Sequence, residues 1–385
     1  MNVLHICLCG PVTDNWNYQD NLLPKYHKKL GYDVSIITSQ WIWDENGNLK
    51  FFGERDYYNN DRVRVIRIPI KGKNDFNKKF KKYKNLSEKI VNLNPDILFI
   101  HGCQFLDIIK IKQYIKNHPK VKAYVDNHAD FSNSATNWIS KNFLHKIVWK
   151  IFAKIIEPYT KKFYGVLPAR VNFLIEIYKV PKEKVELLIM GADDELIEKS
   201  HKKNTKFKIR EKYGITSTDF LIMTGGKINA AKIQTLLLMI AINEIEISNI
   251  KLVVFGSVAP ELQGEVDKLN DGKKIQYIGW ISSKESYEYF NAADLVVFPG
   301  RHSIFWEQVV GQGIPALFKY WEGTTHVDVG GNCLFLVEDS VSEIKEKIEY
   351  IYRNPHFYNK MKEVAQTKGK LEFSYLKIAK ESILE

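Results

Sequence analysis

Short apolar runs that end in glycine recur through the second half of the chain. Residues 220–226 read FLIMTGG, and the runs KLVVFGS, KIQYIGW and DLVVFPG follow. Continuous apolar runs of this length are typical of parallel strands that are buried on both faces of a sheet. A helical stretch from Gln234 to Asn243 follows the first run. Repeated units of strand, glycine loop and helix predict a doubly wound α/β sheet, with its ligand site at the carboxyl ends of the strands.

The first half of the chain has the same alternation. The run VLHICLCG ends in Gly10, and a helix is expected over residues 18–30. Strands are expected at residues 33–38, 63–68, 97–101 and 121–126. A chain of 385 residues exceeds the usual size of one core. Because the periodicity breaks between Met190 and Lys206, we expect two Rossmann-like domains that face each other across a cleft.

Composition narrows the class of protein. The net charge of +11 and the isoelectric point near 9.1 predict an anionic partner, which nucleic acid, lipid headgroups and nucleotide phosphates would all satisfy. The four cysteines have no Cys-x-x-Cys spacing, so neither a zinc site nor a disulfide framework is expected. No stretch reaches the roughly 18 to 20 uncharged apolar residues of a membrane span, and MNVLHICLCG has no leader pattern. We therefore expect a cytoplasmic protein.

The segment GRHSIFWEQVVGQGIP gathers polar groups where the last apolar run ends and a helix begins. Glu307 lies in the first turn of that helix, where its carboxylate can accept hydrogen bonds from a ribose or a sugar diol. The alternative is a helix-start carboxylate that the helix dipole favours. The other candidates for ligand binding in this segment are Gly300, His302, Ser303 and Gln308.

A second candidate site lies in TGGKINAAKIQ, at the end of the first of these runs. Gly226 allows close backbone approach, and Lys227 and Lys232 flank a helix start whose free N–H groups favour phosphate oxygens. These groups suit a diphosphate, and the alternative is a solvated basic loop. The first strand is not followed by G-x-G-x-x-G, and G-x-x-x-x-G-K-[ST] is absent, so the dehydrogenase and P-loop classes lose their main support.

In the first half, His128 directly follows the strand of KAYVDNH and is a candidate for ligand contact, because an imidazole can orient a hydroxyl group. The alternative is a loop histidine with a structural hydrogen bond. Asp130 can orient His128 or cap the next helix. The loop after the first strand offers backbone access, hydrogen-bonding side chains and a stacking face, from Gly10, Asp14, Asn15, Asn17 and Trp16. Asp14 can equally serve as a helix cap.

Lysines alternate with apolar residues in two stretches of the first half. Residues 77–84 read NKKFKKYK, and residues 138–162 carry apolar residues at helical spacing. In the second stretch these are Trp138, Phe143, Ile147, Phe152 and Ile155, with Lys141, Lys146, Lys150 and Lys154 between them. Basic amphipathic helices are typical of interfacial anchors on anionic membranes. The alternative is an ordinary helix that faces the core and exposes its lysines.

The order of several motifs resembles the retaining family-four glycosyltransferases, the group 1 enzymes of bacterial polysaccharide biosynthesis, which have the GT-B fold. The similar segments are Cys9-Gly10, YVDNHADF, MGADDELI, GGKINAAK, WEQVVGQGIPAL and Phe373-Ser374-Tyr375. The resemblance covers nearly the whole chain. It implies an acceptor domain over residues 1–190, a nucleotide-sugar domain over 191–365, and a helix over 366–385 that packs back on the first domain.

The resemblance also implies a reaction. A hexosyl group would pass with retention from a nucleotide diphosphate sugar, expected to be a UDP-sugar, to a glycan or lipid-linked acceptor. His128, Glu307 and Lys232 are then the expected catalytic residues. The donor would be bound by Gly10, Gly226, Lys227, Lys232, Gly300, His302, Ser303, Glu307 and Gln308, and the acceptor by Asp14, Asn15, Trp16, Asn17 and Asp130. Lysines would neutralise the leaving diphosphate, so neither a metal nor a cofactor is expected. The absence of an Asp-x-Asp motif agrees with this expectation.

The chain departs from the family pattern at three points. The family carries two glutamates eight positions apart, and Pro299 stands at the place of the first, with His302 or Ser303 near its space. An alignment on the following glycine and proline puts Gln308, rather than Glu307, at the place of the second. Lys227 stands where arginine is usual, which keeps the charge and loses the bidentate fork.

Other functions stay open at this point. A GT-B relative that epimerises a nucleotide sugar, or a catalytically silent binding subunit, also fits these motifs and their departures. A nucleic-acid-binding protein fits the charge, but no RNA- or DNA-binding motif is present. The leading expectation is a cytoplasmic glycosyltransferase on the inner face of a membrane. Its expected partners are a nucleotide sugar, the acceptor and an anionic membrane surface, with no nucleic acid.

Overall fold

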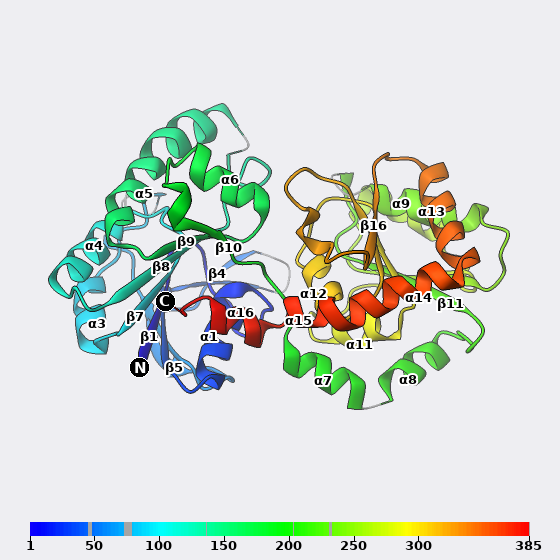
Figure 1. Cartoon of the computed structure of the whole chain (residues 1–385), viewed down its shortest axis with the longest axis horizontal. Coiled ribbons are helices and arrows are strands. Elements are labelled where there is room, and N and C mark those ends of the chain that lie inside the picture. The colour runs from blue at the N-terminus through cyan, green and yellow to red at the C-terminus, as the bar shows by residue number, and fades with distance from the viewer. Residues whose placement is uncertain (45–47, 73–78, 136, 203, 231–232, 385) are drawn as a thin grey trace. The chain divides into compact units, whose positions relative to one another are not determined.

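The computed structural model describes residues 1–384 except 45–47, 73–78, 136, 203 and 231–232. The chain forms two compact units (Figure 1). The first unit comprises Met1–Ile189 together with Ile378–Glu385, and the second comprises Met190–Lys377. The division thus falls next to the expected boundary at residue 190. Of the expected C-terminal segment, residues 378–385 group with the first unit and residues 366–377 group with the second.

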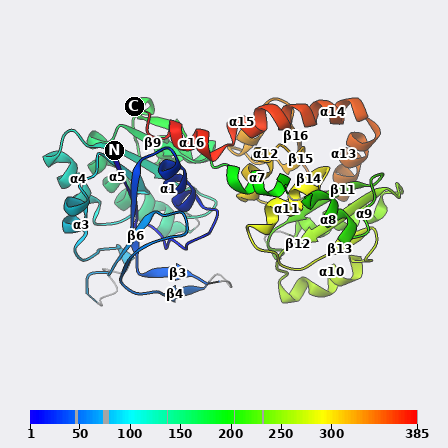
Figure 2. The same ribbon diagram turned by 90° about the horizontal axis from the view of Figure 1, so that it is seen from below.

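The first unit is built on an eight-stranded sheet in the order β10-β9-β8-β7-β1-β2-β6-β5. Its neighbouring strands run parallel except β5, which pairs antiparallel with β6. The strands are β1 (Asn2–Cys7), β2 (Asp33–Ser39), β5 (Arg55–Tyr58), β6 (Arg64–Ile68), β7 (Ile97–His101), β8 (Lys122–Asn127), β9 (Lys162–Gly165) and β10 (Val185–Leu187). A separate hairpin of β3 (Trp41–Trp43) and β4 (Leu49–Phe51) lies at the periphery of this unit (Figure 2).

Helices cover both faces of this sheet. Alternate strand residues such as Leu4 and Ile100 form one apolar core with α3 (Leu86–Leu93), α4 (Ile108–Asn117) and α5 (Lys150–Ile156). The opposite face, which carries His5 and Phe99, is covered by α1 (Gln19–Lys29), because His27 of α1 contacts both residues. Another helix, α6 (Pro168–Glu176), follows β9. All four cysteines are free in this structure.

The stretch from residue 138 to 162 is helical but irregular. It forms a π-helix over Ser140–Trp149, then α5, then a 3-10 turn over Glu157–Tyr159. Phe152 is buried in the core, whereas the side chains of Trp138 and Phe143 are 75% and 51% exposed. One face therefore packs on the core, and a second apolar face stays at the surface. Among the described residues, no helix is both long and apolar enough to cross a bilayer.

The other basic stretch is not an amphipathic helix. Residues 77 and 78 lie outside the described part of the chain. Of the rest, Tyr83 is buried and donates a hydrogen bond from its hydroxyl to the Leu8 carbonyl, 3.0 Å away. The Lys81 ammonium donates to the Cys9 carbonyl. Residues 80–84 are therefore not the expected amphipathic helix, because tertiary contacts fix this segment against the first strand, and membrane association of these residues stays a prediction.

The second unit is a six-stranded, fully parallel sheet in the order β13-β12-β11-β14-β15-β16. The strands are β11 (Phe220–Gly225), β12 (Ile250–Phe255), β13 (Ile275–Tyr277), β14 (Leu295–Phe298), β15 (Ala316–Lys319) and β16 (Cys333–Leu336). One face is covered by α9 (Gln234–Glu244) and α13 (Val341–Arg353), and the other by α7 (Asp194–Lys202), α8 (Thr205–Lys212) and α11 (Glu285–Ala292) (Figure 1).

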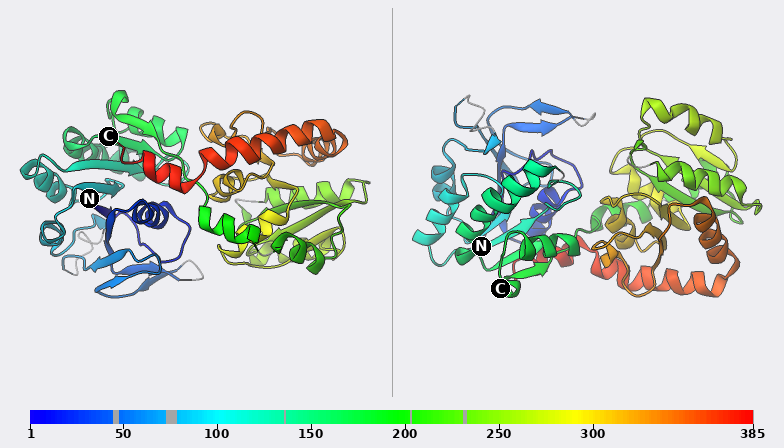
Figure 3. Two further views of the ribbon diagram at one scale, coloured as in Figure 1. Left: turned by 60° about the horizontal axis from the view of Figure 1, so that its bottom comes forward. Right: turned by 90° about the horizontal axis from the view of Figure 1, so that it is seen from above.

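Further short helices complete the second unit. These are α10 (Gln263–Leu269), α12 (Phe305–Gly311), α14 (Pro355–Val364) and α15 (Lys370–Glu372). The chain then passes back into the first unit within α16 (Tyr375–Glu381), drawn in red in Figure 3. In the first unit, the His27 Nε2 atom lies 3.0 Å from the Ala379 carbonyl oxygen, so α16 is tied to α1 there.

Candidate active site

The carboxyl edge of the second sheet holds a buried glutamate between two histidines. β14 ends at Phe298, the loop of residues 299–304 follows, and α12 carries Glu307 in its first turn. The Glu307 side chain is fully buried. Its Oε1 atom accepts hydrogen bonds from His302 Nε2 at 2.7 Å and from His326 Nε2 at 3.0 Å. His326 comes from a 3-10 turn, Thr325–Val327, and was not among the predicted site residues.

The two imidazoles keep this buried carboxylate ionised. Burial by itself would raise the pKa of Glu307, but His302 and His326 outweigh it and hold that pKa well below its usual value. The second oxygen, Oε2, is buried and has no hydrogen-bond partner among the described residues. Glu307 is therefore a buried, charged acceptor with capacity for a further hydrogen bond at Oε2. Glu307 does lie in the first turn of α12, as the helix-dipole alternative expects, and its side-chain hydrogen bonds go to the two imidazoles.

Gln308, the alternative to Glu307, faces a different part of the unit. Its Nε2 atom donates to Ser286 Oγ at 2.9 Å and to Gln312 Oε1 at 3.1 Å. These bonds tie α12 to α11 and leave Gln308 buried. His302 stands near the place of the missing first glutamate, but its Nε2 atom is already engaged with Glu307. Gly300 and Ser303 are half-buried in the same loop.

The expected phosphate loop follows β11. A side chain at Gly225 would meet the Phe255 ring at 2.1 Å, and Gly226 has a φ of 124°, so the chain requires glycine at this turn. Lys227 is exposed beside them. Lys232 lies outside the described residues. The helix α9 begins at Gln234, so the free N–H groups of its first turn follow Lys232 in the sequence and do not lie between Lys227 and Lys232.

In the first unit, His128 follows β8 and its side chain is 42% exposed. Its Nε2 atom lies 3.3 Å from Asp126 Oδ2, and Asp126 is fully buried at the end of β8. Asp130 does not orient His128. It accepts hydrogen bonds from the backbone N–H groups of Ser132 and Asn133 and from Arg170 Nε, so it holds the turn after the strand.

The loop after β1 is more structural than expected. Asp14 Oδ2 accepts from the Tyr57 hydroxyl at 2.8 Å, and α1 begins only at Gln19, so Asp14 is not its cap. Asn15 accepts from the side chain of Asn60, and the Trp16 ring lies 5.5 Å from that of Tyr18. Gly10 has open space around it, so no close contact requires glycine there. Asn17 is half-buried in this loop.

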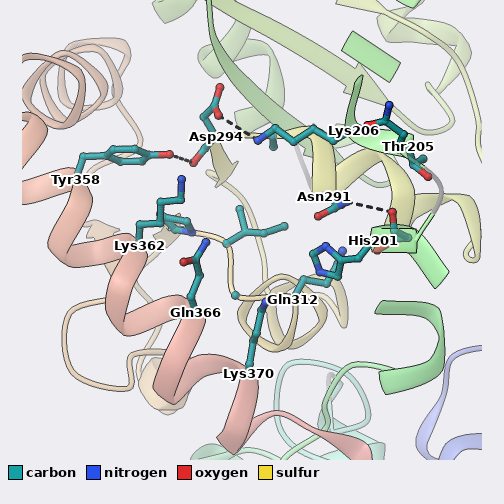
Figure 4. Close-up of a pocket in the computed structure, with 16 residues that line it drawn as sticks. His201, Thr205, Lys206, Asn291, Asp294, Gln312, Tyr358, Lys362, Gln366 and Lys370 are labelled. Atoms are coloured by element: carbon teal, nitrogen blue, oxygen red, sulfur yellow. Dashed lines mark hydrogen bonds and ion pairs between the residues drawn. The ribbon is translucent and has the colours of Figure 1, made fainter. Parts of the chain in front are cut away.

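A separate pocket of about 290 Å³ lies in the second unit (Figure 4). Its lining includes His201, Lys206, Asp294 and Lys362, and the Lys206 ammonium pairs with the Asp294 carboxylate at 3.5 Å. Asp294 directly precedes β14, so the pocket lies at the amino ends of the strands. Ligands of open α/β sheets bind at the opposite, carboxyl edge. We therefore assign the candidate site to the Glu307 edge.

Residues 205–368 match the family model described as glycosyl transferases group 1. The second unit therefore carries a region that matches the group 1 glycosyltransferase domain. The matched range contains Glu307, His302, His326 and the Gly225 turn. A search of curated proteins found no match.

Solved structures of low sequence identity share the fold over the whole chain. A glycosyltransferase from Rickettsia africae ESF-5 has a TM-score of 0.70 at 16% identity and covers 99% of this chain and 98% of its own. Anabaena HepE, solved in complex with UDP, has a TM-score of 0.68 at 12% identity, with coverages of 99% and 98%. The UDP-GlcNAc 2-epimerase of Neisseria meningitidis, bound to UDP-GlcNAc, has a TM-score of 0.61 at 12% identity and covers both chains fully. The predicted GT-B fold, with two Rossmann-like domains, is confirmed.

Proposed function

We propose that the protein transfers a hexosyl group from a UDP-sugar to a hydroxyl of a glycan or lipid-linked acceptor, with retention and without a metal ion. The observation that carries the proposal is the ionised Glu307 with its unpartnered Oε2, at the carboxyl edge of the matched domain. Two vicinal hydroxyls of a ribose or sugar would fill the missing hydrogen bonds. The complex of HepE with UDP supports a uridine nucleotide as the donor's carrier.

In the proposed reaction the bond between the anomeric carbon and the diphosphate oxygen breaks, and UDP leaves with the electron pair. The acceptor oxygen bonds to the anomeric carbon, and its proton passes to the departing phosphate. Lys227 and Lys232 would stabilise the charge on that phosphate, with the glycine turn at Gly226 allowing its approach. His128 would orient a hydroxyl of the donor sugar.

The test is Glu307→Gln. The glutamine oxygen can still accept from both imidazoles, so folding should be retained. Hydrogen bonds to a charged group contribute about 1.5–3 kcal/mol against about 0.5–1.5 for neutral ones. The expected loss in donor affinity or in kcat/KM is therefore about 1–2 kcal/mol, or roughly 5- to 30-fold.

Glu285→Gln is the matched control, because Glu285 also lies in the first turn of a helix and accepts from a backbone N–H, that of Ser282. UDP affinity is measured by calorimetry and transfer by release of UDP. If the Glu307→Gln protein binds and turns over its donor as the wild type does, the site assignment fails.

We also propose that the exposed face of the 138–162 stretch docks on an anionic membrane. Five large apolar side chains there are 48–75% exposed: Trp138, Ile139, Phe143, Ile147 and Ile151. Lys146, Lys150 and Lys154 line the groove that Ile147 and Ile151 share. An apolar stripe flanked by lysines fits the boundary between acyl chains and anionic headgroups. The lysines favour a phospholipid surface over a protein partner.

Co-sedimentation with vesicles tests this docking. Binding should be strong with phosphatidylglycerol vesicles and weak with phosphatidylcholine vesicles, and Phe143→Ser with Ile147→Ser should reduce it. Trp280→Ser is the control, since Trp280 is 65% exposed in the second unit. Equal binding to both vesicle types, or an equal effect of the control, would contradict the proposal.

The fold similarity to a UDP-GlcNAc 2-epimerase keeps epimerisation as the second candidate. Incubation of the protein with UDP-sugars and no acceptor distinguishes the two activities. A new UDP-sugar with an inverted hydroxyl would favour epimerisation. UDP binding without any product would favour a silent binding subunit.

A further inference from the structure

Three buried imidazoles form a continuous hydrogen-bonded row on one face of the first sheet. His27 of α1 lies with Nδ1 3.0 Å from His5 Nε2 on β1. His5 Nδ1 lies 2.9 Å from His101 Nε2 at the end of β7. At the other end of the row, His27 Nε2 is 3.0 Å from the Ala379 carbonyl oxygen. All three histidines are at least 94% buried.

The carbonyl of Ala379 fixes the tautomer of each ring. A carbonyl oxygen can only accept, so His27 Nε2 donates to it. Burial lowers the pKa of His27 to about 4, so this ring is neutral near pH 7 and its Nδ1 accepts from His5 Nε2. His5 Nδ1 then accepts from His101 Nε2. His101 Nε2 therefore carries a proton toward His5, and His101 Nδ1 faces Asp126 at the inner end of the row. Burial alone would lower the pKa of His101, but Cys7 and Asp126 outweigh it and raise that pKa well above its usual value.

The Nδ1 atom of His101 lies close to two other potential ligand atoms. His101 Nδ1 lies 2.8 Å from Asp126 Oδ2, and His128 Nε2 lies 3.3 Å from the same oxygen. Neither approach has the direction of a hydrogen bond, and His101 Nδ1 and Asp126 Oδ2 are both buried without a hydrogen-bond partner. The other carboxylate oxygen, Oδ1, is already occupied by the backbone N–H of Gly102 at 3.1 Å.

We infer that His101 Nδ1, Asp126 Oδ2 and His128 Nε2 form a binding site for a divalent transition-metal ion of the zinc class. The three atoms lie within 4.8 Å of one another. Two imidazoles and one carboxylate suit zinc, cobalt or nickel, whereas calcium and magnesium require oxygen ligands. The ion would take the place of the proton that the Asp126 carboxylate favours on His101 Nδ1.

The surroundings have the features of an open site. His101 and Asp126 are buried, and the His128 side chain is 42% exposed, so a fourth position faces solvent. His5 acts as the outer partner of His101 and fixes the tautomer that a metal requires. The second three-residue group, His302, Glu307 and His326, differs, because both imidazoles are aligned in hydrogen bonds to Glu307 Oε1. In these hydrogen bonds an imidazole proton lies between each Nε2 atom and Glu307 Oε1.

This inference does not depend on the proposed transfer reaction, which needs no metal. If His128 also contacts the donor sugar, zinc bound here would inhibit transfer. Metal binding itself is measured without a donor or an acceptor, so a failure of one proposal is distinguishable from a failure of the other.

The experiment is a titration of chelator-treated, full-length protein with Co²⁺, followed by the visible absorption of the bound ion. One equivalent of Co²⁺ should bind and be displaced by Zn²⁺. His128→Ala is the main variant, because this half-exposed side chain can be removed without opening the core. It should weaken binding by more than about 100-fold, and His5→Gln, which alters only the outer partner, by about 10- to 100-fold.

Two control variants locate the ion. His356→Ala removes an exposed histidine on α14, and His326→Gln removes one member of the other three-residue group. Both should leave the Co²⁺ affinity unchanged. The inference is overturned if no Co²⁺ binds, if His128→Ala binds as the wild type does, or if His326→Gln abolishes the absorption.

Discussion

Acidification should destabilise the first unit through His27. This ring is faced by His5 and, beyond it, His101, by the Ala379 carbonyl, and by Ser382 Oγ, which lies 3.0 Å from His27 Nε2. Burial lowers the pKa of His27 from 6.5 to about 4. The unfolded chain therefore takes up a proton near pH 6.5, and the folded unit takes it up only near pH 4. Stability is full above pH 6.5 and falls as the pH falls through this window.

The size of the loss follows from the two values. The full difference corresponds to about 3.4 kcal/mol, since each tenfold step in proton affinity is worth about 1.36 kcal/mol. At pH 5 the expected loss of unfolding free energy from His27 is about 2 kcal/mol, and at pH 4 it is about 3 kcal/mol. A loss of this size is a large fraction of the stability of an ordinary domain.

The assay is hydrogen exchange by mass spectrometry at pH 7, 6 and 5, corrected for the intrinsic exchange rates, on peptides from α1 and α16. His27→Gln provides the comparison, because the glutamine amide can donate to the Ala379 carbonyl and its oxygen can accept from His5, yet it does not titrate. This variant should lose less protection on acidification than the wild type. His118→Gln, at an exposed histidine, should behave as the wild type. An equal loss of protection in the wild type and in His27→Gln would refute the reasoning.

Two further predictions concern the proposed transfer. Lys232→Ala should weaken UDP binding by about 1.5–3 kcal/mol, and Lys227→Ala by a similar or smaller amount, because each removes a charge-assisted contact; calorimetry with UDP measures both, and unchanged affinity in both variants would place the diphosphate elsewhere. Transfer should also survive excess EDTA, since lysines rather than a cation neutralise the leaving group. Complete loss of transfer on chelation, with recovery on adding Mn²⁺ or Mg²⁺, would contradict this mechanism.

The sheets were predictable because their strands are continuous apolar runs. Four expected strands of the first unit lie within one residue of β2, β6, β7 and β8, and residues 97–101 coincide with β7. The first strand ends at Cys7, three residues before the expected end at Gly10. In the second unit α9 begins at Gln234, as the pattern indicated. The 138–162 stretch was harder, because its apolar residues do not all share one face. Phe152 of α5 packs in the core, whereas Phe143 of the preceding π-helix lies at the surface. The wider turn of a π-helix shifts the faces, so a period of 3.6 residues does not predict which side chains are buried.

Ligand groups that form across a sheet were harder to predict. His101 and Asp126 are Cα partners in the register of β7 and β8, and both end apolar runs that were expected as strands. Their proximity follows from that register, which the sequence does not state. His5 and His27 join them only because α1 covers the same face. His326 lies in a short 3-10 turn without any periodic pattern, so nothing in the sequence marked it.

The choice between Glu307 and Gln308 shows the same limit at the scale of one helical turn. Neighbouring residues of an α-helix point about 100° apart, so a shift of one position in an alignment exchanges two different surroundings. Glu307 points to His302 and His326 at the carboxyl edge of the sheet, whereas Gln308 points to Ser286 of α11. A glutamate placed at 308 would lose a hydrogen-bond donor toward Gln312, and a glutamine at 307 would lose the charge that two imidazoles stabilise. The side chains in contact with each position, rather than the spacing to Gly313 and Pro315, therefore favour Glu307 over Gln308 for the proposed carboxylate role.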